Sequence, residues 1–210
     1  MKKDVVRIRV LLADDHPVMR DGLRAAIESA GDMDVVGEAG DGVEAVARFQ
    51  QCQPDVSVLD IQMPLLDGLQ AIAQIRALDA AARIVVLTTY PGDARAKKAL
   101  ASGAIAYLLK SSTREEILNA IRAAAQGRGM LSAEVASDVA LHAGADMLTG
   151  RELAVLQLVA TGHSNKEIAE KLTVADDTVK ARLQSAMVKL GASDRAHAVT
   201  LAVKRGFLDR

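Results

Sequence analysis

The sequence predicts two domains, an α/β domain built on a parallel sheet and a smaller all-helical domain after it. Short apolar runs alternate with amphipathic stretches over the first 126 residues, which is typical of a parallel sheet covered by helices on both faces. From about Leu148 onward only helical patterns remain. With 210 residues, half of them apolar, the chain is long enough for two small cores.

Five apolar runs are the expected strands of the first domain, and a helical pattern follows each of them. The runs are continuous in Val, Ile and Leu, as expected for strands buried on both faces. The expected strands are Ile8–Ala13, Val35–Ala39, Val56–Leu59, Arg83–Thr88 and Ala104–Leu109. The expected helices are Pro17–Ala30, Val43–Gln51, Gly68–Ala77, Asp93–Ser102 and Arg114–Gln126, the last one preceded by a capping box at Thr113.

The second domain is expected to contain four helices. Capping boxes at Thr149 and Ser164 begin the first two, and further helices are expected over Asp176–Leu190 and from Asp194 to Arg205. Two short helices joined by a tight turn suggest a helix-turn-helix. We therefore predict a first domain over residues 1–126, a linker over 127–146 in which 133–141 is a candidate helix, and a second domain over 147–210.

Charge and composition limit the function classes. The net charge is −1, but residues 147–210 hold 10 basic against 7 acidic side chains, which is compatible with nucleic acid as a partner.

Cys52 is the single cysteine, so neither a disulfide nor a thiolate metal cluster is expected. No apolar stretch approaches 18 residues and no signal-peptide pattern is present, so we expect a cytoplasmic protein with no membrane partner.

Polar residues end or directly follow four of the expected strands. Asp14 and Asp15 follow the first strand, Asp60 the third and Lys110 the fifth, while Thr88 ends the fourth. Parallel strands end at one edge of the sheet, so these groups should converge there. Carboxylates suit Mg²⁺, and Thr88 and Lys110 can bind phosphoryl oxygens, which points to in-line phosphoryl transfer onto Asp60.

With these residues in order on the expected elements, residues 8–126 resemble a response-regulator receiver domain, whose fold is flavodoxin-like (βα)5. The resemblance implies that Asp60, within Asp-Ile-Gln-Met-Pro-Leu-Leu-Asp-Gly, is the phosphoacceptor. It implies Mg²⁺ bound by Asp15, Asp60 and the backbone carbonyl of Gln62, with Asp14 assisting. Thr88 and Tyr107 would be the switch pair.

Simpler interpretations exist for several of these residues. In the simpler interpretation, Asp14 does no more than cap a turn, and Tyr107 does no more than pack in the core. We interpret Asp67 and Gly68 as turn residues, and His16 as a surface residue because no second histidine lies near it.

The expected helix over 176–190 has two distinct faces. The face expected to pack inward holds Val179, Leu183, Ala186, Met187 and Leu190. The opposite face holds Asp177, Ala181, Gln184, Ser185 and Val188, flanked by Thr178, Lys180 and Lys189. Small and hydrogen-bonding groups edged by bases can approach DNA base edges and phosphates, although an ordinary solvated face has the same pattern.

The sequence of this region resembles that of the LuxR-type DNA-binding domain. The matching segments are Leu-Thr-Gly-Arg-Glu from 148, Gly-His-Ser-Asn-Lys-Glu-Ile-Ala from 162, Asp-Thr-Val-Lys from 177 and Lys-Leu-Gly from 189. The resemblance implies groove contacts from Lys180 and Gln184, with Ala181 on the same face and Lys189 at its edge. Asn165, Lys166 and Thr178 would support them or contact phosphate. Ala175, Arg182 and Gln184 depart from the family pattern, and we expect Asp176 to replace the usual cap.

Together the two halves resemble a NarL/FixJ-type response regulator. The resemblance implies a transcription regulator rather than an enzyme, with a sensor histidine kinase and double-stranded DNA as partners and a homodimer when phosphorylated. The last helix, with Ala198, Leu201 and Ala202, is the candidate dimer contact. Two alternatives stay open: a phosphorylation-independent DNA-binding regulator, and a phosphorelay or protein-interaction regulator.

Overall fold

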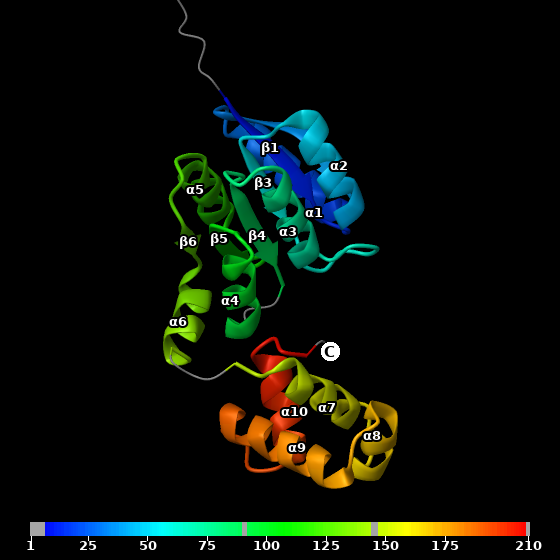
Figure 1. Cartoon of the computed structure of the whole chain (residues 1–210). Helices are drawn as coiled ribbons and strands as arrows, with labels where there is room; N and C mark the ends of the chain where they lie inside the picture. Colours follow the sequence, from blue (N-terminus) through cyan, green and yellow to red (C-terminus); the bar gives the residue numbers. More distant parts are fainter. Residues whose placement is uncertain (1–6, 90–91, 144–146, 209–210) are drawn as a thin grey trace, which may run out of the picture. The chain divides into compact units, whose positions relative to one another are not determined.

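The computed structural model describes residues 7–89, 92–143 and 147–208. The chain divides into two compact units, one built on a parallel sheet and one built on helices. The order of elements along the chain alternates strand and helix up to α6 and is helical thereafter (Figure 1).

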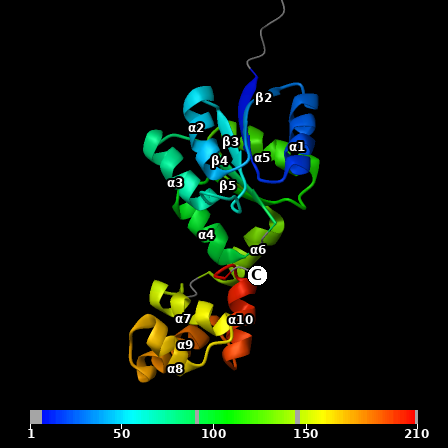
Figure 2. The same ribbon diagram turned by 90° about the vertical axis from the view of Figure 1, so that its right-hand side faces the viewer.

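The first unit has a six-stranded parallel sheet in the order β2-β1-β3-β4-β5-β6. Figure 2 shows α2, α3 and α4 on one side of the sheet and α1 and α5 on the other. The strands are β1 Ile8–Ala13, β2 Met33–Ala39, β3 Val56–Leu59, β4 Ile84–Thr88, β5 Ala106–Leu109 and β6 Met130–Leu131. The helices over this part of the chain are α1 Pro17–Ser29, α2 Gly42–Cys52, α3 Gly68–Leu78, α4 Asp93–Ala101, α5 Arg114–Ala125 and α6 Ala133–Leu141, and the division between the units falls within α4 and α6.

The flavodoxin-like α/β fold predicted from the sequence is confirmed, and the five expected strands are present to within about two residues at each end. One strand was not expected. The short β6 falls in the predicted linker and pairs in parallel with β5, through Ala106 with Met130 and Tyr107 with Leu131. A run of two apolar residues carries too little periodicity to be recognised as a strand.

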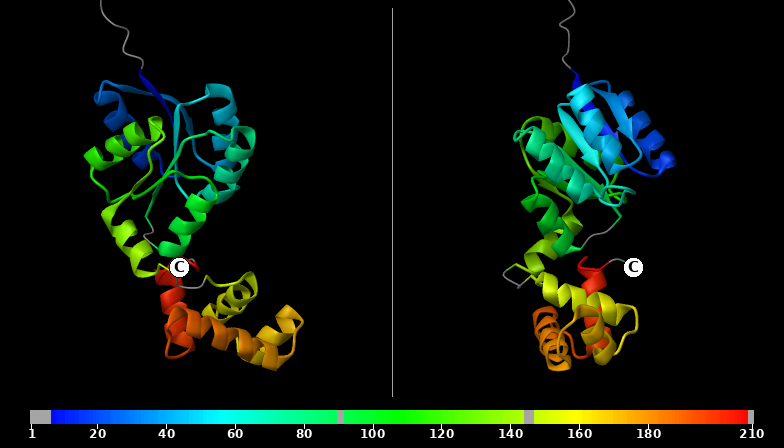
Figure 3. Two further views of the ribbon diagram at one scale, coloured as in Figure 1. Left: turned by 60° about the vertical axis from the view of Figure 1, so that its left-hand side comes forward. Right: turned by 45° about the vertical axis from the view of Figure 1, so that its right-hand side comes forward.

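The second unit contains α7 Gly150–Ala160, α8 Asn165–Leu172, α9 Asp176–Leu190 and α10 Arg195–Lys204 (Figure 3). Its core is aliphatic and takes side chains from all four helices, among them Val155, Ile168, Leu183 and Ala202. The predicted capping boxes at Thr149 and Ser164 are both formed, and Gly191 ends α9 with a positive φ of 67°.

One expectation for these helices was wrong. Ala175 rather than Asp176 is the N-cap of α9, because the helix already begins at Asp176. The methyl group of Ala175 cannot form a side-chain hydrogen bond to the first turn. On α10, Ala198 and Ala202 are fully buried in the core of the unit, whereas Leu201 is half-buried. The role of α10 as a dimer contact stays a prediction, and these two alanines pack in the scaffold.

Candidate functional site

The carboxyl ends of β1 and β3 bring two acidic side chains together. Ala13 pairs with Leu59 in the parallel register, and the Asp60 amide donates a hydrogen bond to the Ala13 carbonyl over 2.8 Å. Asp14 and Asp60 therefore leave adjacent strands at the same level. Both are buried polar residues, with relative exposures of 3% and 4%.

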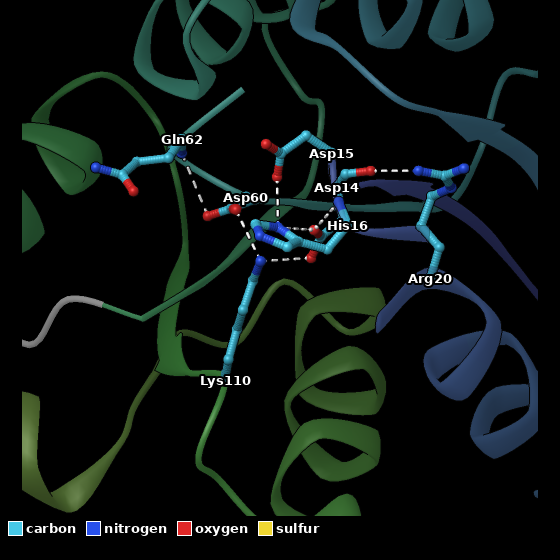
Figure 4. A network of polar contacts seen from close by, with 7 residues as sticks. All are labelled: Asp14, Asp15, His16, Arg20, Asp60, Gln62 and Lys110. Atoms are coloured by element: carbon cyan, nitrogen blue, oxygen red, sulfur yellow. Dashed lines mark hydrogen bonds and ion pairs between the residues drawn. The ribbon is translucent and has the colours of Figure 1, made fainter. Parts of the chain in front are cut away.

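Lys110 follows β5 and bridges these two carboxylates. Its Nζ lies 2.7 Å from Asp14 Oδ2 and 2.8 Å from Asp60 Oδ2 (Figure 4). Burial lowers the pKa of Lys110, but its hydrogen bonds to Asp14 and Asp60 outweigh this effect and leave the pKa raised, so the ammonium stays charged. Burial raises the pKa of Asp60, and the Lys110 ion pair opposes that rise and favours the ionised, nucleophilic form.

Asp15 and His16 complete the cluster on its open side. His16 Nδ1 lies 2.6 Å from Asp15 Oδ1 and 3.4 Å from Asp14 Oδ1, although 69% of the His16 side chain is exposed (Figure 4). One ligand atom from each of Asp14, Asp15, His16 and Asp60 lies within 4.8 Å of the others. Three carboxylates at this spacing fit a hard divalent cation such as Mg²⁺. His16 is exposed, as expected, but it also touches the acidic pair.

The loop after Asp60 is shaped by two local contacts. The Gln62 amide donates to Asp60 Oδ1 over 3.3 Å, and its side chain points away from Asp60 (Figure 4). Asp67 forms a capping box with Gln70 at the start of α3, which agrees with its interpretation as a turn residue. A Cβ on Gly68 would lie 2.0 Å from the Asp60 carbonyl oxygen, so glycine is required where α3 begins against the phosphoacceptor candidate.

Thr88 and Tyr107 lie on the adjacent strands β4 and β5 and are both fully buried. Thr88 pairs with Leu109 across the ladder, one residue before Lys110. The structure thus brings Thr88 to the same strand edge as Asp14, Asp60 and Lys110. Tyr107 lies deeper in the sheet, where Val86 is its partner on β4.

In the second unit, α9 shows the two faces expected from the sequence. Val179, Leu183, Ala186 and Leu190 are buried, whereas Met187 is only half-buried. The exposed residues that were predicted to face DNA are Lys166 on α8 and Lys180, Ala181 and Gln184 on α9. Asn165 and Thr178 are half-buried.

Lys189 is placed differently from the other candidates. Its Nζ donates to Glu152 Oε2 over 2.9 Å and to the Met147 carbonyl over 3.3 Å. Ser185 Oγ donates to the other oxygen of Glu152 over 2.6 Å. Lys189 therefore joins α9 to α7, and its role at DNA stays a prediction.

Two arginines that were not among the candidates line a hollow of about 770 Å³ beside α9. Arg151 and Arg182 contribute to its wall together with Thr149 and Thr178. The sequence carried only a weak signal for them, namely that Arg182 departs from the family pattern. The wall also includes Glu152, but the two arginines give the hollow an excess of positive charge next to the exposed face of α9, which suits a DNA phosphate.

Comparison with known proteins finds a family match for each of the two units. Residues 10–122 match the response regulator receiver domain, and residues 146–202 match the luxR family of bacterial regulatory proteins. The chain therefore belongs to the response regulators: it is a two-component response regulator that combines a receiver domain with a LuxR-type DNA-binding domain.

Individual relatives match over nearly the whole length. The chain is 41% identical to the uncharacterized transcriptional regulatory protein YxjL of Bacillus subtilis, covering 99% of this chain and 100% of YxjL. It is also 41% identical to the transcriptional regulatory protein LiaR of the same organism, covering 93% and 96%. Among solved structures, RcsB of Salmonella enterica bound to promoter DNA with a phosphomimetic is 27% identical, with a TM-score of 0.74 and coverage of 94% and 98%.

None of the described helices is long and apolar enough to cross a membrane. The family is regulatory rather than one of classical enzymes.

Proposed function

We propose that this cytoplasmic protein accepts a phosphoryl group on Asp60 from a sensor histidine kinase and, in that form, binds DNA as a homodimer to regulate transcription. The observation that carries the proposal is the buried bridge from Lys110 to Asp14 and Asp60, with Asp15 beside it. A lysine held against two acids at a sheet edge is suited to binding the oxygens of an incoming phosphoryl group.

The carboxylates present fit Mg²⁺, and Asp15, Asp60 and the backbone carbonyl of Gln62 would hold it, with Asp14 assisting. When bound, the cation would offset the negative charge of the phosphoryl group. In the transfer, an Asp60 oxygen forms the new bond to phosphorus while the bond from phosphorus to the donor breaks in line with it. Lys110 and Thr88 bind the phosphoryl oxygens.

Two exposed apolar side chains support docking of a kinase at this edge. Val18 follows the acidic pair by a few residues and is 85% exposed, and Leu65 follows Asp60 and is 84% exposed. Contiguous apolar patches are a feature of protein-interaction surfaces, and we propose that these two side chains contribute to one that contacts the kinase.

The switch that links phosphorylation to DNA binding is proposed to be Thr88 and Tyr107. Thr88 would move toward the phosphoryl group, and the change would repack the strand that carries Tyr107. Phosphorylation then shifts a two-state equilibrium, so the unphosphorylated protein should bind DNA weakly rather than not at all.

At DNA, the exposed face of α9 is proposed to enter the major groove with Lys180, Ala181 and Gln184 toward base edges. Asn165, Lys166, Thr178 and Lys189 would support this placement or contact the backbone, and we add Arg151 and Arg182 as phosphate contacts. A dimer would bind two half-sites about one helical turn apart.

The direct test is phosphorylation by acetyl phosphate with Mg²⁺, followed by intact mass measurement. The wild-type protein should gain one phosphoryl group, and Asp60→Asn should gain none. Asp67→Asn is the matched control, since Asp67 lies in the same loop but caps α3. Labelling that survives Asp60→Asn would refute the assignment.

A second experiment separates the alternatives. Full DNA affinity of Asp60→Asn without phosphorylation would favour a phosphorylation-independent regulator. Phosphate contacts make DNA binding steeply salt-dependent. If the LuxR-type domain shows no affinity for duplex DNA that falls with salt, a regulator that acts by binding another protein is favoured.

A further inference from the structure

An acidic residue lies on the face of α9 that is proposed to enter the groove. Asp177, Ala181, Gln184 and Val188 are spaced by four, three and four residues, so they form one stripe along the helix. All four are exposed, and the side chain of Asp177 is 92% exposed at the first turn. We call these four residues the α9 stripe.

A carboxylate on this stripe is unfavourable unless it has a specific partner in the complex. It repels the phosphates of any duplex, whatever the sequence. An acidic residue in the first turn does stabilise a helix, but Asp176 supplies the same charge from a half-buried position off the stripe. Helix stability alone therefore does not require an acid at position 177.

The Asp177 carboxylate is held next to an ammonium group. Lys180 Nζ lies 3.1 Å from Asp177 Oδ1 and 2.7 Å from Asp176 Oδ2. Both hydrogen bonds raise the pKa of Lys180, and the one to Asp176 has the larger effect. The Lys180 side chain is therefore a charged donor. A donor and an acceptor thus lie side by side at the exposed surface of the helix.

This arrangement complements one base pair in the major groove. Guanine presents two adjacent acceptors, O6 and N7, and its cytosine partner presents the N4 amino donor. An adenine–thymine pair has no two adjacent acceptors, because the adenine amino group lies between N7 and the thymine O4.

We propose that Asp177 and Lys180 recognise a G·C base pair as a unit, with Lys180 donating to guanine O6 and N7 and Asp177 accepting from cytosine N4. The inference rests on the proposed DNA-binding function and deepens it. At other base pairs the carboxylate loses its donor and still repels the backbone. Asp177 therefore contributes specificity by rejecting wrong sites as well as by binding the right one.

The test is selection from a random duplex library with the full-length protein, Mg²⁺ and beryllofluoride as a phosphoryl mimic. Wild type should enrich a site with a G·C pair at a fixed position in each half. Asp177→Asn should reduce the preference at that position by at least about tenfold, while its affinity for non-specific duplex rises. Circular dichroism of each variant checks that the helices are retained.

Asp176→Asn is the matched control, because it removes the same charge and another carboxylate partner of Lys180 from a position off the stripe. It should raise non-specific affinity and leave the base preference intact. The inference is overturned if Asp177→Asn keeps every base preference of wild type, or if both variants lose the same preference. A wild-type protein that enriches no sequence would instead refute the proposed function, and this inference with it.

Discussion

Lys189 and Glu152 form a 2.9 Å ion pair that joins the last turn of α9 to the first turn of α7. Glu152 is almost fully buried, and it also accepts hydrogen bonds from Ser185 and from the backbone and hydroxyl of Thr149. One carboxylate therefore adds a polar link between α7 and the helix proposed to enter the groove, beside the apolar core that both helices share.

The first prediction concerns the pH dependence of this contact. Burial raises the pKa of Glu152, but the hydrogen bonds from Ser185, Lys189 and Thr149 outweigh it and lower the pKa from 4.5 to about 2. Because the folded-state pKa is depressed, the stabilisation is present above the unfolded-state pKa near 4.5. It is lost as the pH falls from there toward 2. We expect the second unit to lose on the order of 2 kcal/mol over that interval.

Hydrogen exchange of α7 and α9 amides in the full chain measures this loss. Glu152→Gln should be less stable at neutral pH and should lose less on acidification. Glu170→Gln, at an exposed position of α8, is the control and should follow wild type. An identical pH dependence in wild type and Glu152→Gln would show that the carboxylate does not carry the stabilisation.

The second prediction concerns Lys110. Replacing it by methionine keeps the aliphatic stem but removes the donor to the phosphoryl oxygens, and it leaves Asp14 and Asp60 without their shared cation. Burial already raises the pKa of Asp60, so loss of Lys110 should raise it further and deepen the defect at low pH.

Fluorine NMR titration with beryllofluoride and Mg²⁺ checks this expectation. Lys110→Met should bind the complex at least about tenfold more weakly, the loss of one charged hydrogen bond. Lys98→Met, at an exposed position of α4, should bind as wild type does. Equal affinity of wild type and Lys110→Met would exclude Lys110 as a phosphoryl ligand.

Much of the fold and of the acidic site could be predicted from the sequence. Strand ends are marked by apolar runs that stop at a polar residue, and this pattern alone places Asp14, Asp60, Thr88 and Lys110 on one sheet edge. The capping boxes at Thr113, Thr149 and Ser164 are local patterns of four residues, and all three are formed.

What escaped prediction depends on tertiary contacts. The partner of Lys189 lies 37 residues away on α7, and helical periodicity cannot say toward which neighbour a long side chain bends. The contact of His16 with Asp15 depends on the backbone turn after β1. The inward position of Ala198 and Ala202 was ambiguous because alanine is compatible with either face of a helix.

The third prediction concerns the close approach at Gly68. A Cβ there would meet the Asp60 carbonyl oxygen at 2.0 Å and the Ile61 Cα at 2.7 Å, both of them backbone atoms that cannot move aside independently. Gly68→Ala should destabilise the first unit by about 2 kcal/mol or more and displace the Asp60 carboxylate. Urea denaturation and acetyl phosphate labelling measure the two effects.

Gly22→Ala is the matched control, because Gly22 lies within α1 and nothing lies within 4 Å of its added Cβ. This change should stabilise the unit by about 0.5–1 kcal/mol, since alanine loses less backbone entropy in a helix. Equal stability of the Gly68→Ala protein and wild type would mean that α3 can shift away from Asp60 at little cost.

The last prediction distinguishes backbone contacts from base contacts on α9. Arg182 lines the hollow beside the helix, whereas Gln184 lies on the α9 stripe. Arg182→Ala should weaken binding to all duplexes about equally and reduce the salt slope of log K by about 1, because one phosphate contact is lost. Gln184→Ala should leave that slope unchanged and relax preference at one position. Fluorescence anisotropy over a range of salt concentrations measures both, and a sequence-selective loss in Arg182→Ala would instead place Arg182 at a base edge.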